Sequence, residues 1–398
     1  MSPQFPLPDG PRTGPVPLSV LDLSPISSGS TPAQALRNTV DLAQHAEAAG
    51  YARYWLAEHH LATGVAGISP ALLIQLVASR TERIRVGSGA VQLGHRTALS
   101  VVEEFGLLDA LFPGRIDLGL GRTGFRKPKP AADGGPADPA AAGRVAPRHT
   151  EERTTPEGLL IPKPFDFSQL IGSPLLARYT ELVHYPGAEV PDYREQVETI
   201  QALIRGDLRT ADGLPARALP GEGADLQLWV LGSSAGASAQ AAGALGLPFG
   251  ANYHVSPAAV LEAVEAYRAA FVPSKVLDRP YVLVSADVVV AEDDATARHL
   301  ASPYGLWVHS IRSGRGAIPF PSPEEAAQHA WTPQERALVE DRVRTQFVGS
   351  PETVVARLRA LQAATQADEL LLTTITHSHE DRVRSQSLLA SAWSARTP

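Results

Sequence analysis

Eight short apolar runs, each followed by a segment with helical periodicity, limit the fold of this chain more than any other feature. The runs begin near Leu18, Arg53, Arg83, Arg115, Leu226, Pro248, Tyr281 and Asp368. Apolar runs without polar alternation are typical of parallel strands that are buried on both faces. Eight strand–helix units predict an α/β fold, a (β/α)8 TIM barrel, because an open sheet usually has fewer units and a reversal of strand order.

Several of the intervening segments carry a clear helix start, in which Ser or Thr precedes Pro. The pairs begin at Thr31, Ser69, Ser256 and Ser350. The hydroxyl can cap a backbone N–H of the first turn, and proline fits that turn because its missing N–H would have no partner there. These positions therefore predict where four of the helices begin.

Two long segments interrupt the strand–helix rhythm without breaking the barrel. We expect residues 17–396 to form one domain, with an insertion at about 126–190 after the fourth strand and a second at about 302–346 after the seventh. The first insertion contains "KPKPAADGGPADPAAAGRVAPRHTEERTTPEG", a low-complexity stretch that we expect to be mobile, and then a part apolar enough to order as a lid or interface. The Pro-rich residues 1–16 are expected to form a disordered tail.

Composition excludes several classes of function. The net charge is −7 and no basic stripe is visible, which argues against binding of nucleic acid. The absence of cysteine excludes disulfides, zinc–thiolate sites and a thiol nucleophile. No stretch approaches the roughly 20 apolar residues that span a bilayer. The sequence thus predicts a soluble, cytoplasmic protein that binds neither nucleic acid nor membrane.

Polar residues gather where the predicted strands end, which is where TIM barrels carry their active sites. They include Glu58, His59, His60, His95, Arg122, Ser233, Ser234, His254 and His377. In "AEHH", successive side chains of a strand would point to opposite faces. Either Glu58 and His60 together, or His59 alone, could therefore face one metal ion or ligand. A metal site, a structural role and the pocket of an organic cofactor are all conceivable for this motif. We favour the cofactor pocket and expect no metal, because no further carboxylates complete a site.

The stretch "GSSAGASAQAAGALG" follows the fifth predicted strand and has two interpretations. It can be a phosphate cradle lined by Ser233, Ser234 and Ser238, because N–H groups at the start of a helix attract anions and small residues let a phosphate approach. It can also be a tightly packed Ala-rich helix. Arg122, at the end of the neighbouring strand, could grip the phosphate. The stretch has neither a dinucleotide fingerprint nor the Lys-Ser/Thr of a triphosphate loop, so no nicotinamide site is expected.

From about Leu18 to the last helix the chain resembles the bacterial luciferase-like flavin monooxygenases, most closely their single-chain members, and the likeness is strongest in three stretches. The stretches are "YWLAEHHLATGVAGISPALLIQLVASRTERIRVGSGAVQL", "EEFGLLDALFPGRIDLGLGRTGF" and "GSSAGASAQAAGALGLPFGANYH". The resemblance implies a barrel that binds FMN, or in some branches a deazaflavin, at its C-terminal face. It also implies that Arg122 and the three serines hold the flavin phosphate. The Gly89–Ala90 peptide stands where the family has a cis bond beneath the flavin ring.

The resemblance further implies an enzyme that uses reduced FMN from a separate reductase, together with oxygen, to oxidise a small organic substrate. His59 would be the catalytic pocket histidine, and His60, His254 and His377 are candidates for substrate contact. The aromatic residues of the first insertion have two interpretations, contact with an apolar substrate or packing of the insertion onto the barrel: Phe165, Phe167, Tyr179 and Tyr185. Pairing through outer helices, as is usual in the family, predicts a homodimer.

Departures from the family pattern argue against the activity of luciferase itself. Gly121 replaces a cysteine of luciferase, and the region after the seventh strand does not match, so light-emitting aldehyde oxidation is not expected. The alternatives are a deazaflavin-dependent hydride-transfer oxidoreductase of the same superfamily and a flavin-binding protein without enzymatic activity.

Overall fold

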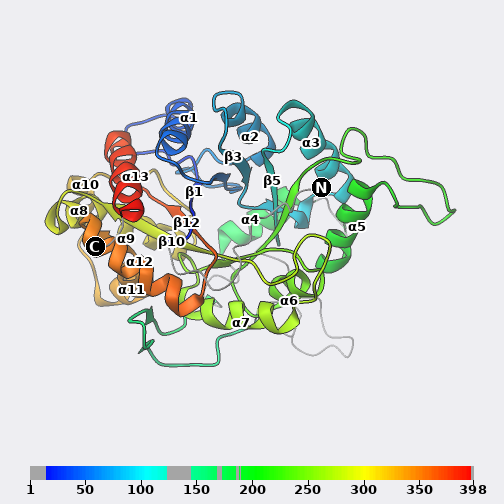
Figure 1. The fold of residues 1–398 in the computed structure, drawn as a ribbon. Helices are drawn as coiled ribbons and strands as arrows, with labels where there is room; N and C mark the ends of the chain where they lie inside the picture. Colours follow the sequence, from blue (N-terminus) through cyan, green and yellow to red (C-terminus); the bar gives the residue numbers. More distant parts are fainter. Residues whose placement is uncertain (1–14, 123–144, 168–172, 185–187, 189, 396–398) are drawn as a thin grey trace.

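The computed structural model describes residues 15–122, 145–167, 173–184, 188 and 190–395. Most of the expected N-terminal tail, much of the low-complexity stretch and Tyr185 lie outside these residues. Eight parallel strands close a barrel, as the eight apolar runs predict (Figure 1). They are β1 (Leu18–Asp22), β2 (Arg53–Leu56), β3 (Arg85–Ser88), β5 (Ile116–Gly121), β8 (Gln227–Gly232), β9 (Phe249–Asn252), β10 (Val282–Val290) and β12 (Glu369–Thr373).

The barrel closes because its last strand pairs with its first. Leu18 of β1 stands opposite Leu370 of β12, and Val20 stands opposite Tyr54 of β2. Helices cover the outside in a ring (Figure 1). They are α1 (Pro32–Ala48), α2 (Pro70–Ala78), α3 (Ala98–Leu111), α5 (Tyr193–Arg205), α6 (Ala237–Ala244), α7 (Val260–Ala270), α12 (Pro351–Thr365) and α13 (His379–Ser394). The predicted fold class, an α/β TIM barrel, is confirmed.

The predicted helix starts are correct in position but differ in their caps. Proline occupies the first turn at all four places. The side chain of Thr31 accepts from the N–H of Gln34, and Ser350 accepts from the N–H of Thr353. Ser69 and Ser256 make no side-chain cap bond, so proline alone marks those two starts. None of the described helices is long and apolar enough to cross a membrane.

Two indole rings fill the middle of the barrel. Trp55 of β2 and Trp229 of β8 meet edge to face, with ring centroids 5.3 Å apart. Gly119 makes room for them, because a Cβ at this position would lie 2.6 Å from the Trp55 ring and 2.0 Å from the carbonyl oxygen of Ser88. Large interior side chains opposite glycine give the layered packing that keeps a TIM barrel solid.

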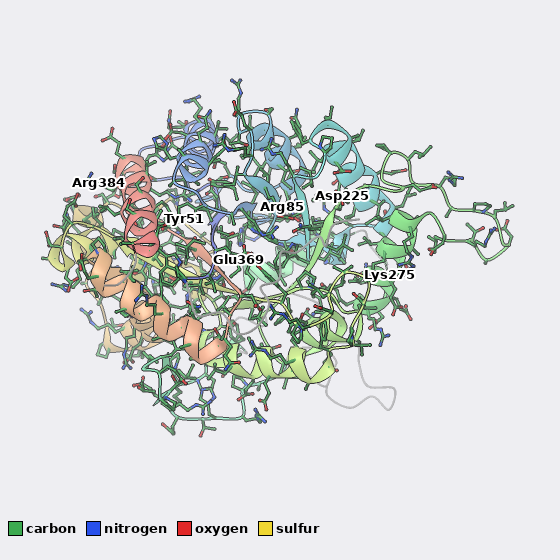
Figure 2. All side chains as sticks on the ribbon, viewed as in Figure 1. Tyr51, Arg85, Asp225, Lys275, Glu369 and Arg384 are labelled. Atoms are coloured by element: carbon green, nitrogen blue, oxygen red, sulfur yellow. The ribbon has the colours of Figure 1, made fainter. Side chains whose placement is uncertain are left out.

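A charged layer closes the N-terminal end of the barrel below the indoles. Arg53 donates to Asp117 at 2.8 Å, to Gln227 at 2.7 Å and to Glu369 at 3.2 Å, and all four side chains are buried. Figure 2 shows Glu369 near the centre of the ring of helices. The ions are paired and hydrogen-bonded, as buried charges must be.

The segments between the barrel units hold the remaining elements. In the first expected insertion lie β6 (Arg153–Thr154), β7 (Leu160–Ile161) and α4 (Pro174–Val183). After β10 come α8 (Asp294–Ala301), α9 (Tyr304–Arg312), α10 (Pro323–Ala327), α11 (Pro333–Thr345) and β11 (Phe347–Gly349), and after β3 come β4 (Val91–Gln92) and the 3-10 helix η1 (Leu93–His95). The segment before α10 reaches the loops after β1 and β2, where Phe320 donates to the carbonyl of Ile26 at 2.7 Å.

Candidate active site

The serine stretch forms the connection from β8 into α6 at the C-terminal end of the barrel. Ser233 and Ser234 lie in this connection and Ser238 in the first turn of α6; Ser234 and Ser238 are each 5% exposed. The N-cap is Gly236, which offers no side chain to accept from the first-turn N–H groups. A helix start without a side-chain cap, flanked by hydroxyls, has the donor set that binds a phosphate.

Arg122 lies beside this stretch, because β5 and β8 are neighbouring strands. Tyr193, the first residue of α5, connects the two. Its hydroxyl donates to the carbonyl of Leu120 at 2.9 Å. Burial raises the pKa of Tyr193, while the charge of Arg122 and a hydrogen bond with Ser238 act in the opposite direction. The guanidinium and the Ser238 hydroxyl therefore border the same buried phenol.

The peptide between Gly89 and Ala90 follows β3 and is cis. This geometry is the one that the resemblance implied. Gly121, at the end of β5, lies against the same peptide, because a Cβ at position 121 would lie 3.0 Å from the Cβ of Ala90. A side chain at position 121, such as the cysteine of luciferase, would therefore press on Ala90.

Glu58, His60 and His95 come together behind the cis peptide. Glu58 accepts from the Nε2 atoms of His60 and His95 at 2.9 and 3.0 Å, and from the N–H of Gln92 at 2.9 Å. Burial raises the pKa of Glu58, but these three bonds outweigh it and lower the pKa to about 2. Glu58 is thus ionised and fixes both rings. Tyr179 of α4 donates to the side chain of Gln92, which brings the first insertion to this cluster.

His59 lies in the loop after β2, between Glu58 and His60, whose side chains bond each other. Solvent reaches the side chain of His59, but many protein atoms also lie around the ring. This desolvation, with the nearby His60, lowers the pKa of His59 to about 4. The ring is therefore neutral near pH 7 and can either donate or accept a proton.

His254 follows β9, and its surroundings include four residues that the sequence analysis missed: Ser285, Asp287, Tyr304 and Arg342. Its Nδ1 lies 2.7 Å from the Ser285 hydroxyl. Burial, together with the charges of Arg342 and His59, lowers the pKa of His254 to about 3. Arg342 of α11 donates to the hydroxyl of Tyr304 at 2.6 Å and to Asp287 at 3.3 Å. The second insertion thus places a buried cation beside this histidine.

A signal for this network was present in the sequence. Asp287 interrupts the apolar run "YVLVSADVVVA", and a carboxylate in a buried strand requires a partner. Tyr304 also donates to it. The partners could not be chosen from sequence, because Arg342 is 55 residues away.

His377 lies at the end of β12 and is held by the loop after β1. Its Nε2 lies 3.2 Å from both the carbonyl oxygen and the hydroxyl of Ser28, and its carbonyl accepts from Ser27 at 2.6 Å. The ring of His377 therefore faces a neighbouring loop, whereas His59 and His254 are close enough to interact electrostatically.

Comparison with known proteins agrees with this geometry. A model of the luciferase-like monooxygenase family matches residues 16–145 and 186–368. The chain belongs to this family. YvbT of Bacillus subtilis, whose function is uncharacterised, is 37% identical over 95% of this chain and 97% of its own length. A luciferase-like monooxygenase of Escherichia coli K12 is 31% identical over 93% of this chain and 95% of its own length.

Several solved structures share the fold over nearly the whole chain. Apo-MsnO8 superposes with a TM-score of 0.71 and 30% identity, covering 95% of this chain and 98% of its own. The oxygenating constituent of 3,6-diketocamphane monooxygenase of Pseudomonas putida, solved with FMN, has a TM-score of 0.61 at 18% identity over 95% and 97% of the two chains. An F420-dependent secondary alcohol dehydrogenase has a TM-score of 0.58 at 12% identity over 96% and 100%. The last two likenesses show the fold alone. The predicted family and the prediction of an oxidoreductase are confirmed.

Proposed function

We propose that this luciferase-like protein is a monooxygenase that binds reduced FMN, supplied by a separate reductase, and uses oxygen to oxidise a small apolar organic compound. The observation that carries the proposal is the meeting of the α6 N-terminus, Ser238 and Arg122 around Tyr193. This donor set suits the phosphate of FMN. When bound, reduced FMN supplies the electrons that activate oxygen.

The proposed roles of the protein residues follow from their positions. Arg122, Ser233, Ser234 and Ser238 bind the phosphate, and the Gly89–Ala90 peptide backs the ring system. His59 is neutral and exposed in the mouth of the barrel, so it is the group proposed to move a proton during the reaction. His254 can serve the substrate only through Nε2, because its Nδ1 faces Ser285. His60 is a positioning residue rather than a substrate contact in this proposal, since Glu58 holds its Nε2.

The aromatic residues of the first insertion support an apolar substrate. Tyr179 stands against His60 with ring centroids 6.2 Å apart, so one wall near the histidines is aromatic. Phe165 and Phe167 pack on each other, and Arg312 of α9 stacks over Phe165 at 3.9 Å, which joins the two insertions. A cytoplasmic location and a homodimer, both expected from the sequence, are retained as parts of the proposal.

The phosphate site is tested by comparing reduced FMN with reduced riboflavin, which lacks the phosphate, under anaerobic conditions. Charge-assisted hydrogen bonds contribute about 1.5–3 kcal/mol, so Arg122→Ala should raise the Kd of FMN about 10- to 100-fold and leave the Kd of riboflavin nearly unchanged. Arg83→Ala, an exposed arginine before β3, is the matched control and should change neither. Equal losses for both flavins, or no loss for FMN, would reject the phosphate role.

The choice between FMN and a deazaflavin is tested separately. Reduced FMN and a reduced deazaflavin are bound to the wild-type protein without oxygen, and each complex is then mixed with oxygen. Preferential binding of FMN, followed by fast reoxidation, supports the monooxygenase. Preference for the deazaflavin without an oxygen reaction identifies the hydride-transfer alternative, and binding of FMN without turnover of any flavin identifies a binding protein.

A further inference from the structure

The second insertion contains a cluster of metal-ligating side chains that the proposed flavin reaction does not use. His309 comes from α9, His329 from the segment after α10, and Glu335 from the first turn of α11. One ligand atom from each residue lies within 4.8 Å of the other two. Three segments that are separate in sequence thus converge on one point.

The distances in this cluster suit metal ligands better than hydrogen bonds. The Nε2 of His309 lies 3.6 Å from Glu335 Oε1, and the Nε2 of His329 lies 3.5 Å from Oε2. Both are too long for good hydrogen bonds. Two ligands of a tetrahedral ion with bonds of about 2.0–2.1 Å lie roughly 3.3 Å apart. The two histidine–carboxylate distances are thus close to the separation of ligands that share an ion.

One of these nitrogens is also buried without a partner. Among the described residues, His329 Nε2 has no hydrogen-bond partner and almost no contact with solvent. A buried polar atom that lacks a partner is costly, and such an atom in a folded protein requires an explanation. Coordination of a metal ion by this nitrogen would supply one.

Surrounding contacts fix the orientation of the three side chains. The N–H and the hydroxyl of Thr332 donate to Glu335 Oε2 at 2.9 and 3.1 Å. Trp331 packs edge-on against His329 with ring centroids 4.7 Å apart. The guanidinium of Arg315 lies 3.4 Å from His309 Nδ1 and can only donate, so it must turn away for this ring to carry its proton on Nδ1 and leave Nε2 for a metal. Such outer contacts are typical of metal sites.

The other histidine–carboxylate cluster, formed by Glu58, His60 and His95, differs in this respect. There both imidazoles meet one carboxylate oxygen at 2.9 and 3.0 Å, which are hydrogen-bond lengths, and the second oxygen accepts from Gln92. The bonds of Glu58 are therefore satisfied without an ion.

We propose that His309, His329 and Glu335 bind a divalent transition-metal ion of the zinc class, with water completing the coordination. Two imidazoles and one carboxylate form a donor set that Zn²⁺ accepts readily. The ion ties α9 to α11, the two helices that carry Tyr304 and Arg342 to Asp287. Its role is to hold the second insertion on the barrel.

The test uses the full-length protein after treatment with a chelator. Co²⁺ replaces Zn²⁺ and gives visible absorption bands that are intense when four ligands surround it. We expect one Co²⁺ per chain, displaced by Zn²⁺, and a Zn²⁺-dependent rise in Tm, because a ligand of the native state stabilises it. His329→Gln and Glu335→Gln should weaken binding about tenfold or more and abolish the rise.

The variants are chosen so that loss of folding cannot be mistaken for loss of the site. Glutamine at position 335 can still form the capping box with Thr332, and circular dichroism checks the fold of each variant. His60→Gln, in the other cluster, and the exposed His299→Ala are controls that should bind Co²⁺ like the wild type. Absence of Co²⁺ binding, unchanged binding by His329→Gln, or loss of binding in His60→Gln would each overturn the proposal.

Discussion

Replacement of Arg53 by methionine should destabilise the barrel strongly without touching the proposed flavin site. Arg53 is 5% exposed and donates to Asp117 and Glu369, whose exposures are 0% and 1%. Methionine has a comparable length but no charge, so the change leaves two carboxylates in a layer that water does not reach. Removal of one partner from a buried ion pair costs about 3–5 kcal/mol.

The contacts that remain keep the loss within that range. Asp117 retains Arg85, whose Nη2 donates to Oδ1 at 2.8 Å. Glu369 retains the hydroxyl of Tyr281 at 3.0 Å. Arg53 also lies 4.9 Å above the Trp229 ring, and the loss of this cation–π contact adds about 0.5–1 kcal/mol. We expect a loss of about 3–5 kcal/mol in the free energy of unfolding.

Equilibrium unfolding in urea, followed by circular dichroism and by tryptophan fluorescence, measures this loss. The double variant Arg53→Met with Glu369→Gln removes one of the two carboxylate charges that lose Arg53. Its free energy of unfolding should be about 1–2 kcal/mol higher than that of the single variant. A loss below about 1 kcal/mol for Arg53→Met, or a double variant no more stable than the single one, would refute the view that the layer is held by charge pairing.

Two further predictions concern pH and packing. The pKa of His254 is lowered from 6.5 to about 3, so the unfolded chain takes up this proton below pH 6.5 while the folded chain does not. The folded protein therefore loses stability as the pH falls from 6.5 towards 3. The urea midpoint of unfolding should fall less for His254→Gln than for the wild type between about pH 7 and about pH 4.5. Parallel plots of the midpoint against pH for the two proteins would contradict this. Gly106→Ala should lower the free energy of unfolding by about 1–3 kcal/mol or more, because the added Cβ would lie 2.2 Å from the Cα of Gly221. Leu107 is exposed on the same helix, so Leu107→Ala should change the free energy of unfolding by no more than about 0.5 kcal/mol. Equal changes in Tm for the two variants would contradict the close-packing argument.

The barrel could be predicted from sequence because burial on both faces leaves a mark in each strand. All eight apolar runs became barrel strands, including the long run that forms β10. β11 was not predicted, since Phe347–Gly349 is too short to show a period and only extends the pairing of β10. β6 and β7 were missed for the same reason, because each is two residues long.

The candidate site could be predicted in its members more than in its contacts. Position at a strand end was enough to select His59, Arg122 and the serines. The bond between Glu58 and His95 joins residues 37 apart, and the bond between Tyr193 and Leu120 joins residues 73 apart. No periodicity encodes such pairs, since they depend on how the chain is packed in three dimensions.

The second insertion contributes to the electrostatics at the C-terminal end of the barrel. Arg342, on α11, is buried against Asp287 of the barrel and lowers the pKa of His254. Burial is the largest cause of the lowered pKa of His254, and the charge on this helix of the second insertion adds to it. If substrate is recognised beside His254, its chemistry must suit a neutral imidazole next to a paired guanidinium. Differences in substrate among related barrels should accordingly follow changes in this insertion.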